Sequence, residues 1–226
     1  MTTSERAAQN PPHAVTAPSE SIEDFMTDHF LIATFVRNGV IRGNLNLIRG
    51  ALDTLALQEY GTVAPGGWFR WIAEIQEVAK MTAEVNTLES AASGVATIGR
   101  ICGDCHQSHS VPITYIATDF HPAGRPGTLQ YRMSRHRWAA DRMWEGLIGP
   151  SDESWQAGAR ELASVSAEPP VTVPALPAEF SRDLVRVQEI GQLAVEAETP
   201  EQRAAVYASF LSRCAGCHAL RMQVQF

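Results

Sequence analysis

The chain has 226 residues, of which 45% are hydrophobic and 19% charged, and its net charge is −7. This composition is that of an ordinary globular protein, long enough for one medium domain or two small ones. The acidic charge, without a basic run or a basic–aromatic patch, argues against binding of nucleic acid and favours a partner with a basic surface.

Residues 1–21 are polar and contain three prolines, so we expect a flexible N-terminal tail. They lack the apolar core of a signal peptide. The longest mostly apolar run of the chain, residues 30–36, is far too short to span a bilayer. We therefore expect no transmembrane segment.

Two copies of one unit follow the tail. "MTDHF" at Met26 recurs as "MSRHR" at Met133, an offset of 107 residues, and "IQEV" at Ile75 recurs as "VQEI" at Val187, an offset of 112. The change of offset predicts a five-residue insertion in the proline-rich stretch 164–178, as expected for a surface loop. The predicted organisation is a first unit at 22–109, a linker at 110–130 and a second unit at 131–226.

Each unit is predicted to contain four helices. In the first unit they cover about 22–42, 44–57, 68–85 and 87–102. Gly43 and Asn44 suit a helix end followed directly by a new N-cap. In the second unit, residues 199–202 form a capping box that starts the fourth helix. Strand patterns are essentially missing, so the sequence predicts an all-α fold of two tandem antiparallel four-helix bundles.

All four cysteines lie in two motifs, "CGDCH" and "CAGCH", at matching places of the repeat. In a helix, the two cysteines and the histidine of such a motif share one face. The two thiols can then reach the two vinyl groups at one edge of a porphyrin, while the imidazole reaches the iron from the same side. The pattern is therefore typical of a c-type haem, and two copies predict two haem c groups. The residues are Cys102, Cys105 and His106 in the first unit and Cys214, Cys217 and His218 in the second.

Three other uses of the cysteines are open. A four-cysteine zinc site would require the ends of two separate bundles to converge. A redox dithiol of the thioredoxin kind would need a βαβ context that the sequence lacks. Disulfides within each pair would leave the two adjacent histidines unexplained. Attachment of haem is therefore the favoured interpretation.

The first helix of each unit carries a histidine that can meet the other face of a haem. His29 and His136 occupy matching positions of the repeat, and each lies on an apolar stripe that faces the core. A lone histidine there is usually a hydrogen-bonded core residue, but a haem iron nearby favours a distal ligand. Met26 and Met133, one turn earlier on the same face, are the alternative distal ligands and would raise the reduction potential.

The other histidines, tryptophans and arginines have simpler interpretations. His13, His109 and His121 lack counterparts in the repeat and are expected to be solvated. The five tryptophans are expected to pack in the cores or at the haem edges. The arginines at 132, 135, 137 and 142 are expected to form a solvated face, with one or two available for haem propionates.

The motifs and the helix order resemble the four-helix-bundle cytochromes c, the cytochrome c′ and c-556 class, over residues 22–109 and 131–220. The resemblance implies thioether links at the four cysteines, proximal iron ligands at His106 and His218, and a distal residue from the first helix. The chain differs from that class in having two units, each shorter than a typical member, and an inward histidine on each first helix. These differences favour low-spin electron transfer over the five-coordinate gas binding of cytochrome c′.

The sequence thus favours a dihaem protein that carries electrons between a redox donor and an acceptor, alone or in a larger respiratory or photosynthetic complex. No nucleophile, acid–base pair or phosphate loop indicates an enzyme. The alternatives are a haem-based binder or sensor of small gases and a haem-free helical scaffold that binds another metal. Because thioether attachment is completed outside the cytoplasmic membrane, we expect a periplasmic or otherwise exported protein.

Overall fold

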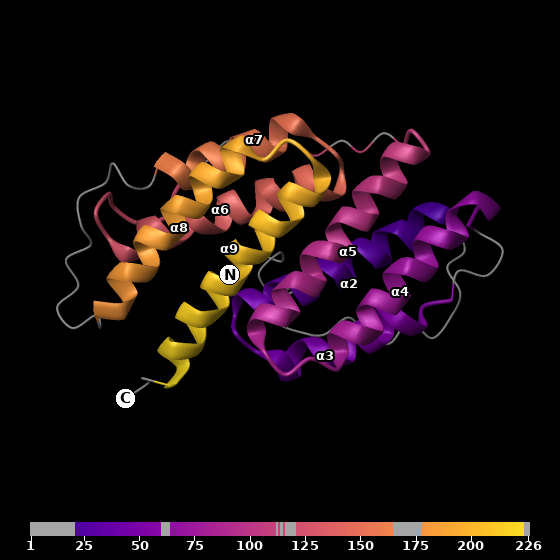
Figure 1. The fold of residues 1–226 in the computed structure, drawn as a ribbon, viewed down its shortest axis with the longest axis horizontal. Helices are drawn as coiled ribbons and strands as arrows, with labels where there is room; N and C mark the ends of the chain where they lie inside the picture. Colours follow the sequence, from indigo (N-terminus) through magenta and orange to yellow (C-terminus); the bar gives the residue numbers. More distant parts are fainter. Residues whose placement is uncertain are drawn as a thin grey trace.

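The computed structural model describes residues 21–59, 64–111, 113, 115, 121–164 and 178–223. Within these residues the fold is all-α, as predicted, with eight α-helices, one short 3-10 helix and no strand (Figure 1). None of the described helices is both long and apolar enough to cross a membrane. The elements are α2 (Ile22–Ile41), α3 (Leu45–Leu57), η1 (Gly66–Trp68), α4 (Phe69–Ala83), α5 (Leu88–Ser108), α6 (Leu129–Ile148), α7 (Asp152–Ser164), α8 (Ala178–Glu196) and α9 (Pro200–Gln223).

The helix bounds follow the sequence repeat. α2 and α6 have 20 residues each and α3 and α7 have 13 each, and the offset of 107 carries one pair onto the other, residue for residue. The offset of 112 carries Gly66, where η1 begins, onto Ala178, where α8 begins. The predicted insertion lies mostly in residues 165–177, which are outside the described residues.

The predicted caps are confirmed. Gly43 adopts a φ of +69°, a left-handed conformation that favours glycine, directly after the C-cap of α2. Asn44 then caps α3, because its side-chain oxygen accepts a hydrogen bond from the backbone nitrogen of Leu47 at 3.1 Å. At the start of α9, Thr199 and Gln202 each accept a hydrogen bond from the other's backbone nitrogen.

Two helix bounds differ from the prediction. α5 does not end at Cys102 but continues to Ser108, so the whole first cysteine motif lies on one straight helical face. α6 begins at Leu129, inside the stretch 110–130 that was predicted to be the linker. The earlier start has a local cause, since the hydroxyl of Thr128 accepts a hydrogen bond from the backbone nitrogen of Tyr131.

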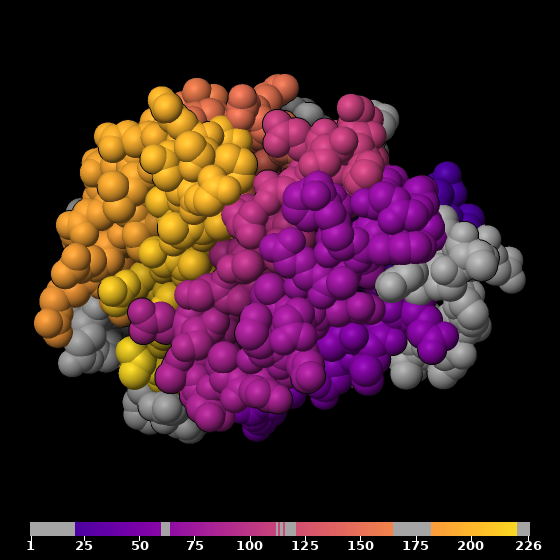
Figure 2. Space-filling model, turned by 45° about the vertical axis from the view of Figure 1, so that its right-hand side comes forward, coloured from indigo at the N-terminus to yellow at the C-terminus, as the bar shows by residue number. Residues whose placement is uncertain are grey.

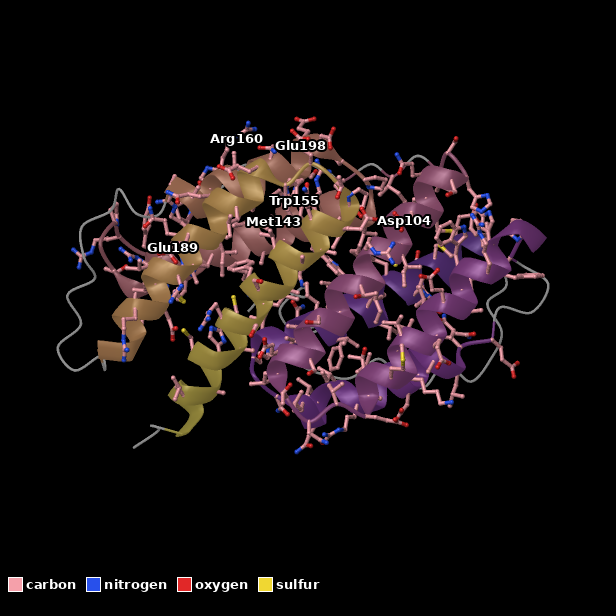
Figure 3. All side chains as sticks on the ribbon, viewed as in Figure 1. Asp104, Met143, Trp155, Arg160, Glu189 and Glu198 are labelled. Atoms are coloured by element: carbon pink, nitrogen blue, oxygen red, sulfur yellow. The ribbon has the colours of Figure 1, made fainter. Side chains whose placement is uncertain are left out.

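Consecutive helices pack on each other in both units, but the two units also share one core. α5 packs along α9 at the centre of the molecule, and Figure 2 shows the two helices adjoining on one face. α2 also contacts α9, and α5 contacts α6. A single set of buried apolar side chains therefore runs through both units, with Met143 and Trp155 fully buried within its second half (Figure 3). The two units are not separate bodies.

Contacts between α2 and α6 have the reciprocity of a pseudo-twofold axis. Arg37, a buried residue of α2, forms an ion pair with Asp141 of α6 at 2.5 Å. Trp144 of α6 donates a hydrogen bond from Nε1 to the hydroxyl of Thr34 of α2 at 3.2 Å. The offset of 107 carries position 34 onto 141 and position 37 onto 144. Each of the two contacts therefore joins the same two positions of the repeat, with the roles of the units exchanged.

Candidate haem sites in the two units

The first cysteine motif presents its three side chains toward the interior. Cys102 and Cys105 are both 8% exposed, one turn apart on the buried face of α5. His106 follows on the same face, and its Nδ1 lies 2.8 Å from the backbone oxygen of Ile148 at the end of α6. A carbonyl oxygen can only accept, so Nδ1 carries the proton and Nε2 keeps a lone pair. This is the tautomer that an iron-ligating histidine requires.

His29 of α2 lies across from this motif. Its side chain is buried, and its Nδ1 hydrogen-bonds the side-chain oxygen of Gln58 at 2.9 Å. Its Nε2 is buried without any hydrogen-bond partner. Buried polar nitrogens are nearly always satisfied in folded proteins, so an unsatisfied one on this face indicates a ligand site.

A cavity of about 270 Å³ lies between the two histidines, close to the lower end of the range of roughly 300–1,000 Å³ that is typical of small-molecule sites. Its wall is mostly apolar and is shared by α2, α4, α5 and the chain after α5. A larger open groove of about 620 Å³ runs between α5, α8 and α9, but it is lined by charged and small side chains without cysteine or histidine. We therefore place the site in the smaller cavity, which is lined among others by Met26, His29, Trp71, Cys102, Cys105, His106 and Tyr115.

Burial sets the protonation of these groups. Desolvation lowers the pKa of His29 to about 4, against the hydrogen bond to Gln58, which raises it. Desolvation raises the pKa of Cys102 to about 12 and that of Cys105 to about 11. Both histidines are thus neutral lone-pair donors at pH 7, and both thiols are protonated. Asp104, which lies between the two cysteines and is labelled in Figure 3, forms an ion pair with Arg100 one turn earlier on α5.

The second unit repeats this arrangement with more solvent access. His136 of α6 is buried, and its Nε2 also lacks a hydrogen-bond partner. Burial lowers the pKa of His136 to about 3, with smaller effects from the charges of Arg132, Arg135 and His218. His218 is therefore close enough to act on His136. Cys214 and Cys217 are only half-buried, and the thiol of Cys217 donates a weak hydrogen bond to Asp183 at 3.4 Å.

The two sites have to be interpreted from their own residues. Comparison of the chain with protein-family models, with curated proteins and with solved structures found no match. The chemistry of the donor atoms is therefore the basis for choosing among the uses of the cysteines.

The donor set fits a haem better than the other uses of the cysteines. All four cysteines are free thiols, and disulfides within each pair would leave the buried, unpartnered Nε2 of His29 and of His136 unexplained. No group of three or more histidine, cysteine, aspartate or glutamate side chains in the described parts of the chain is arranged to hold a metal ion. A haem iron needs only two axial ligands from the protein, and each unit offers a buried histidine of the first helix and a second histidine next to a pair of thiols.

Other sequence-based expectations have mixed outcomes. Met26 lines the cavity beside His29, and Met133 is half-buried on α6, so both stay alternatives. His13 and most of the predicted tail lie outside the described residues, and His121 is exposed as expected. The expectation for His109 was wrong: its ring lies 5.5 Å from that of Trp68, and its Nε2 is buried.

The arginine-rich face of α6 was also predicted wrongly. Arg132 is 8% exposed, Arg135 forms an ion pair with Glu161, and Arg142 forms one with Glu145. Only Arg137 of these four is exposed as predicted. The contacts with α7 and the interior were not visible from the composition of α6 alone.

Sequence reasoning missed Gln58 and Tyr115 entirely. Gln58 directly follows α3 and is buried against His29, and Tyr115 lines the cavity from the segment after α5. One sequence signal could have found Gln58. It is a polar residue directly after a predicted helix end, and the matching position of the second unit holds Val165 instead.

Proposed function

We propose that the protein is a dihaem c-type cytochrome that transfers electrons between redox proteins, with one low-spin haem in each unit. One observation carries the proposal. In the first unit the buried His29, whose Nε2 has no hydrogen-bond partner, lines one cavity with the Cys-x-x-Cys-His motif of the fourth helix, and the matching His136 of the second unit is buried with an unpartnered Nε2 as well.

The proposal assigns a role to each residue of the sites. Cys102, Cys105, Cys214 and Cys217 would hold the two haems by thioether bonds, and the haem iron would supply the one-electron redox chemistry. His106 and His218 would be the proximal ligands and His29 and His136 the distal ones. The hydrogen bond from His106 to Ile148 fixes the proximal ring of the first unit in the tautomer that leaves Nε2 free for iron.

Two axial histidines per iron favour electron transfer over the binding of small gases. A six-coordinate iron changes its bonding little between its two oxidation states, and an apolar wall keeps water away. The proposal includes redox partners with a basic docking surface, because the net charge is −7. It also includes an exported location and no enzymatic activity of its own.

The visible absorption spectrum of protein made with a haem-attachment system tests this function. We expect a sharp Soret band, resolved α and β bands on reduction, and two haems per chain. The variants His29→Ala and His136→Ala should each convert about half of the haem to the high-spin form, since each removes one axial ligand. Met26→Ala and Met133→Ala are matched controls, one turn away, and should stay low-spin.

The other outcomes are equally informative. A high-spin spectrum that changes on addition of carbon monoxide would replace electron transfer by gas binding. Loss of the low-spin bands in the methionine variants would move the distal role to Met26 and Met133. A protein without a Soret band would mean that the cysteine motifs hold no haem.

A further inference from the structure

Gln58 is the buried polar side chain that touches the distal face of the first site. It is the C-cap of α3, where an extended backbone conformation ends the helix, and it is 6% exposed. Its side-chain oxygen lies 2.9 Å from Nδ1 of His29. Its own backbone oxygen accepts a hydrogen bond from the side chain of Gln76 at 2.9 Å, so α3, α4 and α2 are tied together at this point.

The described residues of the second unit do not make this contact. The position that matches Gln58 is Val165, whose side chain cannot accept a hydrogen bond; Val165 itself is outside the described residues. None of the described residues hydrogen-bonds the ring of His136. The surroundings differ too, since the residue one turn before His29 is the buried Phe25, with ring centroids 5.3 Å apart, whereas Arg132 holds that place before His136.

We propose that Gln58 is a positioning residue that holds His29 on the iron of the first haem, and that the second haem, where Val165 stands at the matching position of the sequence, gives up its distal histidine more easily. The inference rests on the proposed function, because it needs a haem in each unit. It adds a difference between the two units that the sequence repeat alone does not predict.

The physical cause is the hydrogen bond to Nδ1. An acceptor at Nδ1 fixes the tautomer, prevents the ring from rotating and makes Nε2 more basic. A more basic imidazole binds the oxidised iron more strongly than the reduced iron, so it also lowers the reduction potential of that haem. The half-buried cysteines of the second site make that site more accessible to an external ligand as well.

Titration of the oxidised holoprotein with free imidazole tests this inference, because imidazole competes with the distal histidine for iron. In the wild type we expect two binding phases of different affinity. Gln58→Leu should increase the affinity of the weaker phase by roughly 10- to 100-fold, the usual effect of removing an outer-shell partner, and leave the tighter phase unchanged. The same variant should raise the reduction potential of one haem only.

Three further variants make the result decisive. Gln58→Glu keeps an acceptor oxygen and should preserve the weak phase and lower the potential. Gln76→Leu removes a neighbouring contact that does not touch His29, and should leave the weak phase unchanged. The His136→Ala variant leaves one low-spin haem, so the Gln58 effect can be measured on the first haem alone.

Two results would overturn the inference. One is an unchanged imidazole affinity in Gln58→Leu, and the other is an equal change in both phases. If Gln58→Leu does not fold, as judged by circular dichroism, a loss of the weak phase in Gln58→Glu would overturn it instead. A protein that carries two haems but shows one of these results refutes only the role of Gln58, whereas a protein without haem refutes the proposed function.

Discussion

A buried histidine with an unpartnered ring nitrogen is costly to a folded protein, by about 1–3 kcal/mol for each unsatisfied group. Three histidines of the described residues carry this cost, and two of them, His29 and His136, stand in matching places of the repeat. Both rings also resist protonation, because burial lowers the pKa of His29 to about 4 and that of His136 to about 3. The two residues therefore make the protein without haem sensitive to acid.

The haem-free protein should lose stability as the pH falls from about 6.5 toward 4. In this window the two histidines are protonated in the unfolded chain but stay neutral in the folded one, so protons favour unfolding. Between pH 7.5 and pH 5 we expect a loss of about 2 kcal/mol per histidine, at about 1.4 kcal/mol for each pKa unit. Urea unfolding followed by circular dichroism measures it.

The His29→Leu variant is the control for this effect. It removes one of the two depressed histidines, so its stability should fall about half as far over the same pH range. An equal fall in wild type and variant would mean that His29 is not the group responsible.

For single residues, the sequence predicted those that recur in the repeat and missed those that only the packing of the helices brings together. His29 and His136 were visible because position, apolar surroundings and residue type recur after 107 residues. Gln58 was not, because it lies 29 residues from His29 and touches it only through the packing of α3 on α2. A contact between helices depends on their relative rotation, which helix periodicity does not define.

Among the helices, α5 approaches α6 closely at Gly103, between the two cysteines of the first motif. A Cβ at this position would lie 2.3 Å from the backbone oxygen of Leu147, so no side chain fits. In the second motif the matching residue is Ala215, and a Cβ added at its neighbour Gly216 would meet no atom within 4 Å. The two motifs are therefore packed differently against their neighbours.

Gly103→Ala should destabilise the holoprotein by about 2 kcal/mol, because the helices must separate to make room for the methyl group. Gly216→Ala should instead be neutral or stabilising by up to about 1 kcal/mol, since alanine is the better helix former and meets nothing. The unfolding midpoints in denaturant compare the two variants. Equal midpoints would contradict the close approach of α5 to α6.

The sequence predicted the helices better than their packing. Bounds and caps follow from residues within a few positions of each other, such as Gly43 and Asn44, and these were found correctly. The close contact at Gly103 could not be found in this way, because the matching position tolerates Ala215. The Arg132 side chain is buried for a similar reason: its surroundings come from other helices.

As a whole molecule, the two units behave as a pseudo-dimer within one chain. Their interface contains a buried arginine, Arg37, paired with Asp141, and a buried tryptophan, Trp144, bonded to Thr34. If two copies of the first unit met in this way, Arg37 would face Thr34 and remain buried without a counter-charge, which is strongly unfavourable. The residues at these positions thus favour pairing of unlike units.

We therefore expect the holoprotein to unfold in a single transition. Because one apolar core runs through both units, loss of either unit exposes the surface of the other. Helix content, measured by circular dichroism, and the two haem bands should then change at the same denaturant concentration. Two separated transitions would show that the units are independent, and Asp141→Asn, which leaves Arg37 without its ion pair, should lower the single midpoint.

The burial of the first pair of thiols also constrains the order of events during biosynthesis. Cys102 and Cys105 are covered, and their pKa values are raised far above neutral pH, so in the finished fold they are poor nucleophiles. They are covered by α2, α4 and the end of α6, where Ile148 lines the same cavity and the backbone oxygen of Leu147 lies against Gly103. A chain in which α6 has not yet packed on α5 would keep these thiols open. If the first unit carries a haem, as we propose, its attachment would belong to the interval before the end of α6 closes over the site.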